Sequence, residues 1–202
     1  MIAHFRDMLR PADWPSLSAG TRRSNMRHHK HGYSLYELLA TLTLIAVVLG
    51  LGLPSFSGVI ARHRLHAEVN ALFHAIHLAR KESIMRRQVV SICPSFDGVS
   101  CKPGRDWSAG WLMFVNHDRD EPPRIDAGEP LLQTHKVAAN VTITANRPGF
   151  TLRATQKRAT NGTIVVCDQA GRVTPRALVI SYTGRPRVTL ETTRGEPYRC
   201  AN

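Results

Sequence analysis

One stretch constrains this chain more than any other. Residues 32–37 read Gly-Tyr-Ser-Leu-Tyr-Glu, an almost unbroken apolar run follows over 38–53, and Pro54 closes it. Residues 33–53 carry one charged side chain, Glu37, and as a helix they cover roughly 30 Å, the thickness of a bilayer core. We therefore predict a membrane-spanning helix, since a helix buried in a soluble core usually breaks its apolar run sooner. A carboxylate in such a helix needs a cation or a function, and cleavage after Gly32 places an α-amino group four residues from Glu37.

A basic leader, Gly32, an aromatic residue, Glu37 as fifth residue of the mature chain and a closing proline together resemble the signal of type IV prepilins and pseudopilins. The resemblance implies that a prepilin peptidase cuts between Gly32 and Tyr33 and methylates the new amino group of Tyr33. It also implies a single-pass anchor in the inner membrane, then assembly with other pilins through Glu37 into a pilus or pseudopilus. Tyr33 stands where phenylalanine is usual.

The chain divides into four parts. Residues 1–32 are interpreted as the leader and excluded from the fold, and a start at Met26 in place of Met1 would leave a short basic leader. Residues 33–53 form the transmembrane part of a first helix and 54–88 its amphipathic part, with a kink or loosening expected at Pro54. Residues 89–202 are predicted to be a β-rich periplasmic or extracellular domain.

Short runs rich in β-forming residues, separated by Gly, Pro, Asn and Asp, indicate strands. They lie at 89–93, 111–115, 131–135, 141–145, 150–153, 163–167, 177–182 and 188–191. Asn161-Gly162 predicts a tight turn before the sixth run. We expect an α+β fold in which the long N-terminal helix covers a mostly antiparallel β-sheet domain.

Four cysteines in a domain expected to follow a membrane anchor suggest two disulfides. Three pairings are open, and we favour Cys93 with Cys101, which closes a small loop, and Cys167 with Cys200, which pins the tail. Histidine pairs at 63–66 and 74–77 lack an acid or cysteine that would complete a zinc site. The acidic residues of 117–129 lack calcium-loop spacing. Trp107 and Trp111 are expected in packing, and we assign no metal, cofactor or enzymatic activity.

Further motifs resemble the FimT and GspH family of minor pilins and pseudopilins. They are Ala-Arg-Lys-Glu-Ser-Ile at 79–84, Cys-Pro-Ser at 93–95, Asp-Gly at 97–98, Cys101, Asp-Trp-Ser-Ala-Gly-Trp at 106–111 and Phe-Val at 114–115. The resemblance implies a long helix packed on two small sheets, and a minor subunit of a type IV pilus or of a type II secretion pseudopilus.

The C-terminal part carries a further motif, Gly-Arg-Pro-Arg at 184–187, which resembles the DNA-binding motif of FimT-type pilins in naturally competent bacteria. Residues 150–202 hold nine Lys/Arg against three Asp/Glu, whereas 33–149 hold twelve against ten. Guanidinium groups present fixed donors to phosphate oxygens and stay charged, so we expect sequence-independent, salt-sensitive DNA binding. The candidate residues, first choices leading, are Arg185, Arg187, Gly184, Arg172, Arg176, Arg194 and Arg199, and Lys157 and Arg158 extend the patch.

We therefore predict a minor type IV pilin that captures extracellular DNA for natural transformation. The alternatives are a structural pseudopilin of type II secretion or a pilus-assembly initiator without a nucleic-acid role, and an adhesin at the pilus tip. A further alternative is that the charged tail is an ordinary solvated basic surface that binds no ligand.

Overall fold

The computed structural model describes residues 32–154 and 159–200, without the side chains of 51–55. Residues 1–31 of the predicted leader, with the alternative start at Met26, lie outside this range, as do Lys157 and Arg158. The chain divides into two units, residues 1–44 and 45–202, and the boundary falls within the helix α1, Leu35–Arg86. Each unit is described by itself below.

The first helix begins at an N-cap residue, Ser34. The Oγ of Ser34 accepts a hydrogen bond from the Glu37 backbone N–H at 3.2 Å, and the Ser34 carbonyl accepts one from the N–H of Leu38 at 3.1 Å. Ser34 followed three residues later by a glutamate is the usual sequence of such a cap, and the Glu37 carboxylate complements the positive end of the helix dipole. The sequence therefore starts the helix at Leu35.

The helix continues across position 54 without a break and ends at Arg86, where Arg87 adopts a φ of 55°. A left-handed residue directly after a helix is a common stop signal. Arg86 also pairs with Glu82 one turn earlier, with 2.7 Å between Nε and Oε2. Among the residues that the structure describes, no helix is both long and apolar enough to cross a membrane.

Within residues 32–154 and 159–200, eight strands form two antiparallel four-stranded sheets. The first sheet has the order β3-β2-β1-β5, and the second has the order β4-β6-β7-β8. The strands are β1 Val89–Pro94, β2 Gly110–Asn116, β3 Leu131–Lys136, β4 Val141–Ala145, β5 Phe150–Leu152, β6 Gly162–Asp168, β7 Arg176–Ile180 and β8 Pro186–Thr189. Each predicted run overlaps one of them. The predicted α+β class, with a helix on two antiparallel sheets, is confirmed.

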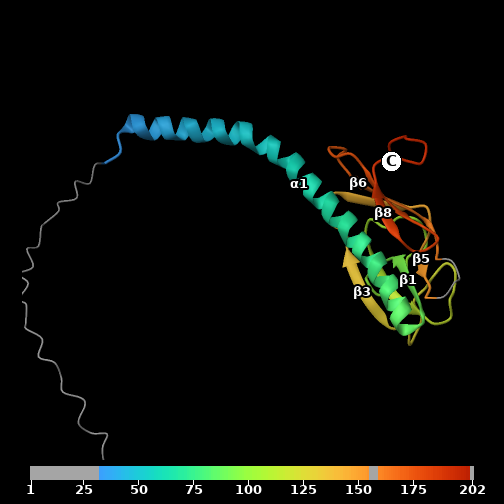
Figure 1. The fold of residues 1–202 in the computed structure, drawn as a ribbon. Coiled ribbons are helices and arrows are strands. Elements are labelled where there is room, and N and C mark those ends of the chain that lie inside the picture. Colours follow the sequence, from blue (N-terminus) through green and yellow to red (C-terminus); the bar gives the residue numbers. More distant parts are fainter. Residues whose placement is uncertain (1–31, 155–158, 201–202) are drawn as a thin grey trace, which may run out of the picture. The chain divides into compact units, whose positions relative to one another are not determined.

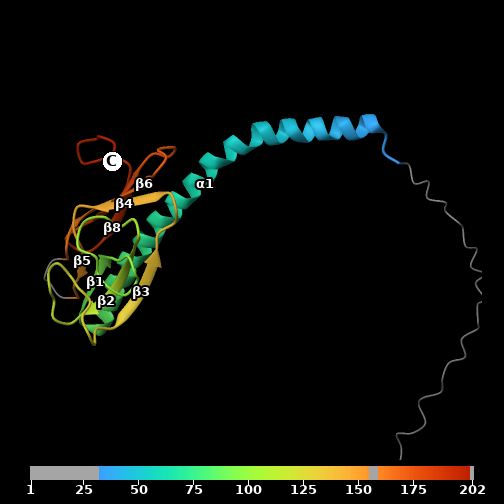
Figure 2. The ribbon, with the colours of Figure 1, turned by 180° about the vertical axis from the view of Figure 1, so that it is seen from behind.

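The second half of α1 packs on these sheets, as Figures 1 and 2 show from opposite sides. Its buried side chains recur at helical spacing and share one core with both sheets; from the helix they include Leu65, Val69, Leu72, Ile76 and Ala79. Trp107 and Trp111 are fully buried, and the Trp107 ring lies 5.7 Å from that of Phe150. The prediction that both tryptophans serve in packing is confirmed.

The tight turn predicted at Asn161-Gly162 is wrong, because Gly162 is the first residue of β6 and pairs with Ile180. A side chain at position 162 would collide with Asn146 Oδ1 and would lie 3.0 Å from the Phe150 ring. The glycine is needed for this close approach and not for a turn.

The two disulfides join the pairs that the sequence favoured, Cys93 with Cys101 and Cys167 with Cys200. The second bond ties the C-terminal segment to β6, across 33 residues of sequence. It fixes where the last arginines of the chain lie.

Candidate nucleic-acid interface

The Gly-Arg-Pro-Arg motif forms the turn between β7 and β8 and the start of β8. The Ser181 N–H donates to the Arg185 carbonyl at 3.1 Å, and the Gly184 N–H donates to the Ser181 carbonyl at 2.8 Å. The Ser181 Oγ contacts the Thr183 hydroxyl at 2.8 Å and accepts from the Arg185 N–H at 3.2 Å. These bonds hold the backbone that carries Arg185 in one conformation.

Gly184 is required by this turn for two reasons. Its φ is +71°, a conformation that side-chain-bearing residues rarely adopt. A β-carbon there would also lie 2.9 Å from Leu152 Cδ1 and 3.4 Å from Ala159 Cβ. The turn is therefore docked against the segment that follows β5, and the Ala159 N–H donates to the Tyr182 carbonyl at 3.0 Å.

Arg185 and Arg187 are both exposed, and Pro186 between them is buried. Arg187 lies opposite Val179, whereas its neighbour Val188 lies opposite the buried Leu178. Because successive side chains of a strand point to opposite faces, Arg187 lies on the face of the second sheet that looks away from the core. We call Gly184, Arg185 and Arg187 the turn site.

The other four predicted arginines lie at the opposite end of the same sheet. Arg176 pairs with Val166 of β6. Asn161, the residue before β6, lies level with Arg185 of the turn site. Arg176 is therefore five residues from that level, which corresponds to about 17 Å along the strands. It shares the face of the buried Leu178, toward the helix. Arg194 and Arg199 belong to the C-terminal segment, which is held at this end by the Glu191–Pro197 bridge and the Cys167–Cys200 disulfide. We call Arg172, Arg176, Arg194 and Arg199 the distal arginines.

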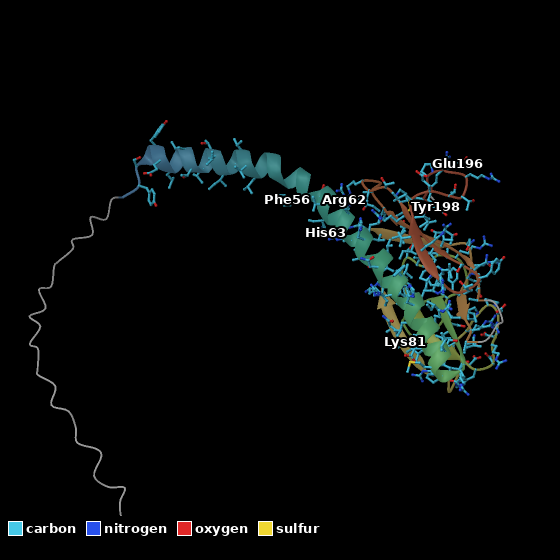
Figure 3. The ribbon with its side chains drawn as sticks, viewed as in Figure 1. Phe56, Arg62, His63, Lys81, Glu196 and Tyr198 are labelled. Carbon is cyan, nitrogen blue, oxygen red and sulfur yellow. A yellow bond between two sulfur atoms is a disulfide. The ribbon has the colours of Figure 1, made fainter. Side chains whose placement is uncertain are left out.

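Contacts with the helix α1 show the same separation between the turn site and the distal arginines. Arg80 Nη1 lies 3.6 Å from a β-carbon built on Gly184, whereas Arg176 acts electrostatically on His66. His66 and Arg80 are about 21 Å apart at 1.5 Å per helical residue. In Figure 3, Glu196 and Tyr198 of the C-terminal segment lie toward the Arg62 end of the packed helix and away from Lys81. The seven predicted residues therefore do not form one patch, since strand register separates them.

Arg172 is engaged within the protein. Its Nε and Nη2 donate to the two carboxylate oxygens of Asp168 at 3.1 and 3.0 Å, and its backbone N–H donates to Oδ2 at 2.9 Å. The hydrogen bond from the guanidinium lowers the pKa of the buried Asp168 carboxyl. An arginine held by a buried carboxylate is a poor candidate for a phosphate contact.

Arg80 lies in the family motif of residues 79–84 but was not among the predicted DNA-binding residues. Its Nη1 is buried under the turn and has no hydrogen-bond partner among the described residues. No carboxylate pairs with it in the part of the chain that the structure covers. A cation in such a setting is less screened than one in water and raises the potential at the turn. Only the docking of the turn onto the helix reveals this charge.

The histidines of α1 do not gather into a metal site. Within residues 32–154 and 159–200, no group of three His, Cys, Asp or Glu residues could hold an ion. His74 and His77 pack edge-on against Phe73. Burial, and then the positive charges of Arg176, Arg62 and His63, lower the pKa of His66.

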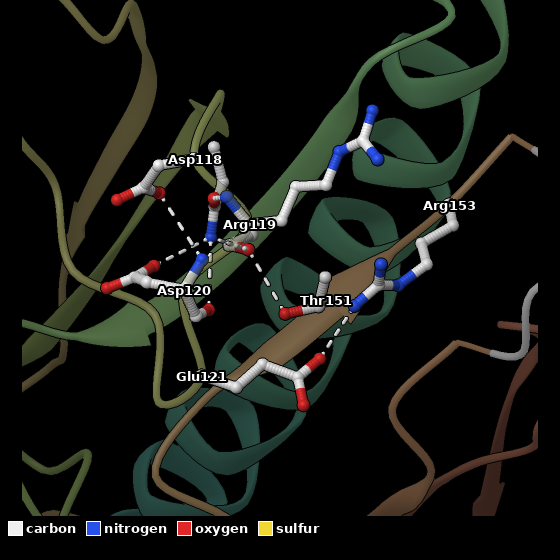
Figure 4. Close-up of polar contacts among 8 residues, drawn as sticks. Asp118, Arg119, Asp120, Glu121, Thr151 and Arg153 are labelled. Atoms are coloured by element: carbon white, nitrogen blue, oxygen red, sulfur yellow. Dashed lines mark hydrogen bonds and ion pairs between the residues drawn. The ribbon is translucent and has the colours of Figure 1, made fainter.

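The acidic residues of 117–129 fix the conformation of their own loop. Asp120 accepts hydrogen bonds from the Arg124 N–H and the Asn116 Nδ2, and Glu129 accepts one from the His117 N–H. Figure 4 shows this loop with Glu121 paired to Arg153 at 2.7 Å. The carboxylates of Asp120, Glu121 and Glu129 thus accept hydrogen bonds from other groups of the same chain.

The N-terminal candidates lie in the first unit. Gly32 and Tyr33 precede the helix and are exposed, and Glu37 is exposed in the first helical turn. The backbone N–H of Glu37 donates to the Ser34 hydroxyl at the N-cap described above.

Comparison with known proteins identifies the family. The family model described as "Type II transport protein GspH" matches residues 68–184, which run from α1 to the turn site. The chain belongs to the GspH family. The prediction of a minor pilin or pseudopilin is confirmed at this level, and nothing in the comparisons separates the FimT branch.

Solved structures similar to this GspH-family chain share low sequence identity with it. The type IV minor pilin FimU of Pseudomonas aeruginosa strain PAO1 is 23% identical, with 69% of this chain and 97% of FimU covered and a TM-score of 0.49. The minor pseudopilin EpsH from the Type 2 Secretion System of Vibrio cholerae is 9% identical, with 62% and 96% covered and a TM-score of 0.46. The search of curated proteins finds no match.

Proposed function

We propose that this GspH-family protein is a minor type IV pilin that binds DNA through its turn site and promotes DNA uptake in natural transformation. One observation carries the proposal: a rigid, hydrogen-bonded turn presents two exposed arginines two residues apart, above a third guanidinium that has no carboxylate partner in the described chain. Such groups bind phosphate oxygens and do not read bases. The binding is therefore independent of DNA sequence and sensitive to salt.

The charge distribution supports the same ligand. The mature chain, residues 33–202, holds 21 Lys/Arg against 13 Asp/Glu, a net charge of +8, and its last 53 residues contain nine Lys/Arg against three Asp/Glu. A basic surface of this kind attracts polyanions over distances comparable to the Debye length, about 8 Å at physiological ionic strength. The turn site adds fixed donors to this general attraction, so it is the place where binding is expected to concentrate.

The direct test is DNA binding by the mature chain, residues 33–202, in an uncharged detergent. The readout is the fluorescence anisotropy of a labelled duplex of mixed sequence at about 0.1 M salt. Replacing both Arg185 and Arg187 by alanine is expected to weaken binding by more than about tenfold, because two phosphate contacts are lost. The matched control is the double replacement of the exposed distal arginines Arg194 and Arg199 by alanine, which removes the same two charges and is expected to change affinity less than about twofold.

Binding that is unaffected by the double replacement would place the activity elsewhere on the protein. Absence of binding by the folded wild-type chain at low salt would refute the proposal. In that case the second candidate, a structural pseudopilin of type II secretion, takes its place. That candidate is favoured by the description of the family, which names a type II transport protein.

We also propose the processing and assembly steps that the sequence predicts. A prepilin peptidase cleaves between Gly32 and Tyr33, the new N-terminus is methylated, and residues 33–53 anchor the subunit in the inner membrane before assembly. The support is the sequence of this segment. Mass spectrometry of the purified protein is expected to show a chain beginning at methylated Tyr33, and Glu37→Ala is expected to abolish incorporation into filaments while leaving cleavage intact. A mature chain that begins elsewhere would contradict this.

A further inference from the structure

The end of the second sheet that carries the turn site also carries a further exposed arginine from a distant part of the sequence. β4 ends at Ala145, β6 begins at Gly162, β7 ends at Ile180 and β8 begins at Pro186, so the connections at these four points meet at one end of the sheet. Arg147 follows β4 by two residues and is exposed. It lies outside the Gly-Arg-Pro-Arg motif.

Contacts within the chain fix the position of Arg147. The Asn146 N–H donates to the Thr163 carbonyl at 3.0 Å, and the Asn146 Oδ1 accepts from the Thr163 N–H at 2.9 Å. Arg147 Cγ lies 3.1 Å from a β-carbon built on Gly162, and its Nε donates to the Asn161 carbonyl at 3.4 Å. The stem of Arg147 therefore crosses the start of β6, and its guanidinium lies beside Asn161.

Strand register gives the spacing between Arg147 and the turn site. Gly162, Ile180 and Pro186 stand in one row across β6, β7 and β8, so Asn161, Ser181 and Arg185 form the next row outward. Two strand spacings separate Asn161 from Arg185, which amounts to about 10 Å. Phosphates of one DNA strand recur every 3.4 Å along the helix axis and lie farther apart along the winding backbone, so a row of this length can contact more than one phosphate of a strand.

Carboxylates that border this end are already paired. Glu121 binds Arg153 at 2.7 Å, and Asp106, bridged to Thr144, lies 3.5 Å from Lys102 Nζ. Beside Gly184 of the turn site the described chain also contributes Arg80, whose buried Nη1 has no hydrogen-bond partner among the described residues. The distal end differs, because Asp168, Glu191 and Glu196 are interspersed among its arginines.

From this arrangement we infer that a nucleic-acid backbone crosses this end of the second sheet, bound between Arg147 on the β4–β5 connection and Arg185 on the β7–β8 turn. The inference rests on the proposed function and extends its site from a short C-terminal motif to two connections that are 38 residues apart in sequence. Arg187, on the outer face two residues further along β8, continues the same path.

The test measures the affinity and its salt dependence for Arg147→Ala, Arg185→Ala and Arg194→Ala, with the mature chain and a labelled duplex of about 30 base pairs. Arg194 is an exposed distal arginine, so its replacement controls for the loss of one positive charge. Arg147→Ala and Arg185→Ala are each expected to weaken binding about fivefold at about 0.1 M salt and to lower the slope of log K against log salt by about 0.9. Arg194→Ala is expected to change neither quantity.

Arg147→Lys separates binding from folding, because it keeps the charge and removes the bond from Nε to Asn161. It is expected to retain most of the affinity that Arg147→Ala loses. Wild-type affinity in Arg147→Ala, alongside weakened binding in Arg185→Ala, overturns the inference and leaves the proposed function standing. Equal losses in Arg147→Ala and Arg194→Ala also overturn it, because the effect is then one of net charge. A wild-type chain that binds no duplex refutes the proposed function and this inference together.

Discussion

Replacing Gly184 by alanine tests whether the turn site is docked as the structure describes. Position 184 has a φ of +71°, and the left-handed conformation costs an alanine roughly 1–2 kcal/mol. The new methyl group would lie 2.9 Å from Leu152 Cδ1 and 3.4 Å from Ala159 Cβ, and overpacking of this kind costs roughly 1–3 kcal/mol. The free energy of unfolding is therefore expected to fall by about 2–5 kcal/mol.

A matched glycine isolates the packing part of that cost. Gly171 has a φ of +68° but nothing within 4 Å of the position of a β-carbon, so Gly171→Ala bears the backbone cost alone. Urea denaturation of the two variants, followed by circular dichroism, is expected to show Gly184→Ala less stable than Gly171→Ala by about 1–3 kcal/mol. Shortening Leu152 to alanine is expected to reduce that difference. Equal stability of the two glycine variants would refute the docking of the turn against Leu152.

Three further predictions concern the contacts that hold the domain together. Asp168→Asn is expected to lower the free energy of unfolding by about 2 kcal/mol at pH 7. Arg172 lowers the pKa of Asp168 in the folded state. The difference in stability between the two proteins is therefore present above about pH 4 and vanishes as the pH falls through the folded pKa. Glu68→Ala is expected to lower the free energy of unfolding by about 2–4 kcal/mol, as measured by chemical denaturation. Glu68 is buried, accepts a hydrogen bond from the Ala138 N–H at 2.9 Å and contacts His135 Nε2 at 2.8 Å. Opening the disulfide that spans 33 residues is expected to cost about 3.7 kcal/mol and opening the one that spans 8 about 2.5 kcal/mol, measured on serine double variants.

Local signals in the sequence predicted the strands well. The run at 141–145 coincides with β4, and the other runs differ from their strands by a few residues at the ends. The alternation of apolar residues, with turn residues between the runs, is a local property of the sequence. It can therefore be recognised without knowledge of the tertiary fold. Ser34, with Glu37 three residues later, is likewise a local signal that marks the start of the helix.

The errors came from properties that only packing decides. Asn161-Gly162 has the composition of a tight turn, but the glycine is there because Phe150 and Asn146 approach the backbone of β6 closely. Counting basic residues along the tail grouped Arg176 with Arg187, whereas the register of β7 and β8 places them at different ends and on opposite faces of the sheet. Arg80 and Arg147 joined the candidate site through long-range docking, which leaves no mark in a four-residue motif.

The salt dependence of DNA binding by the wild-type mature chain, beside the Arg185→Ala, Arg187→Ala double variant, tests the central claim most directly. A plot of log K against log salt is expected to be linear for the wild type. The double variant is expected to have a slope smaller in magnitude by about 1.8, because each of the two lost phosphate contacts would have released about 0.9 counterion. Equal slopes for the two proteins, or no binding by the folded wild type at low salt, would contradict the claim that this turn binds a nucleic-acid backbone.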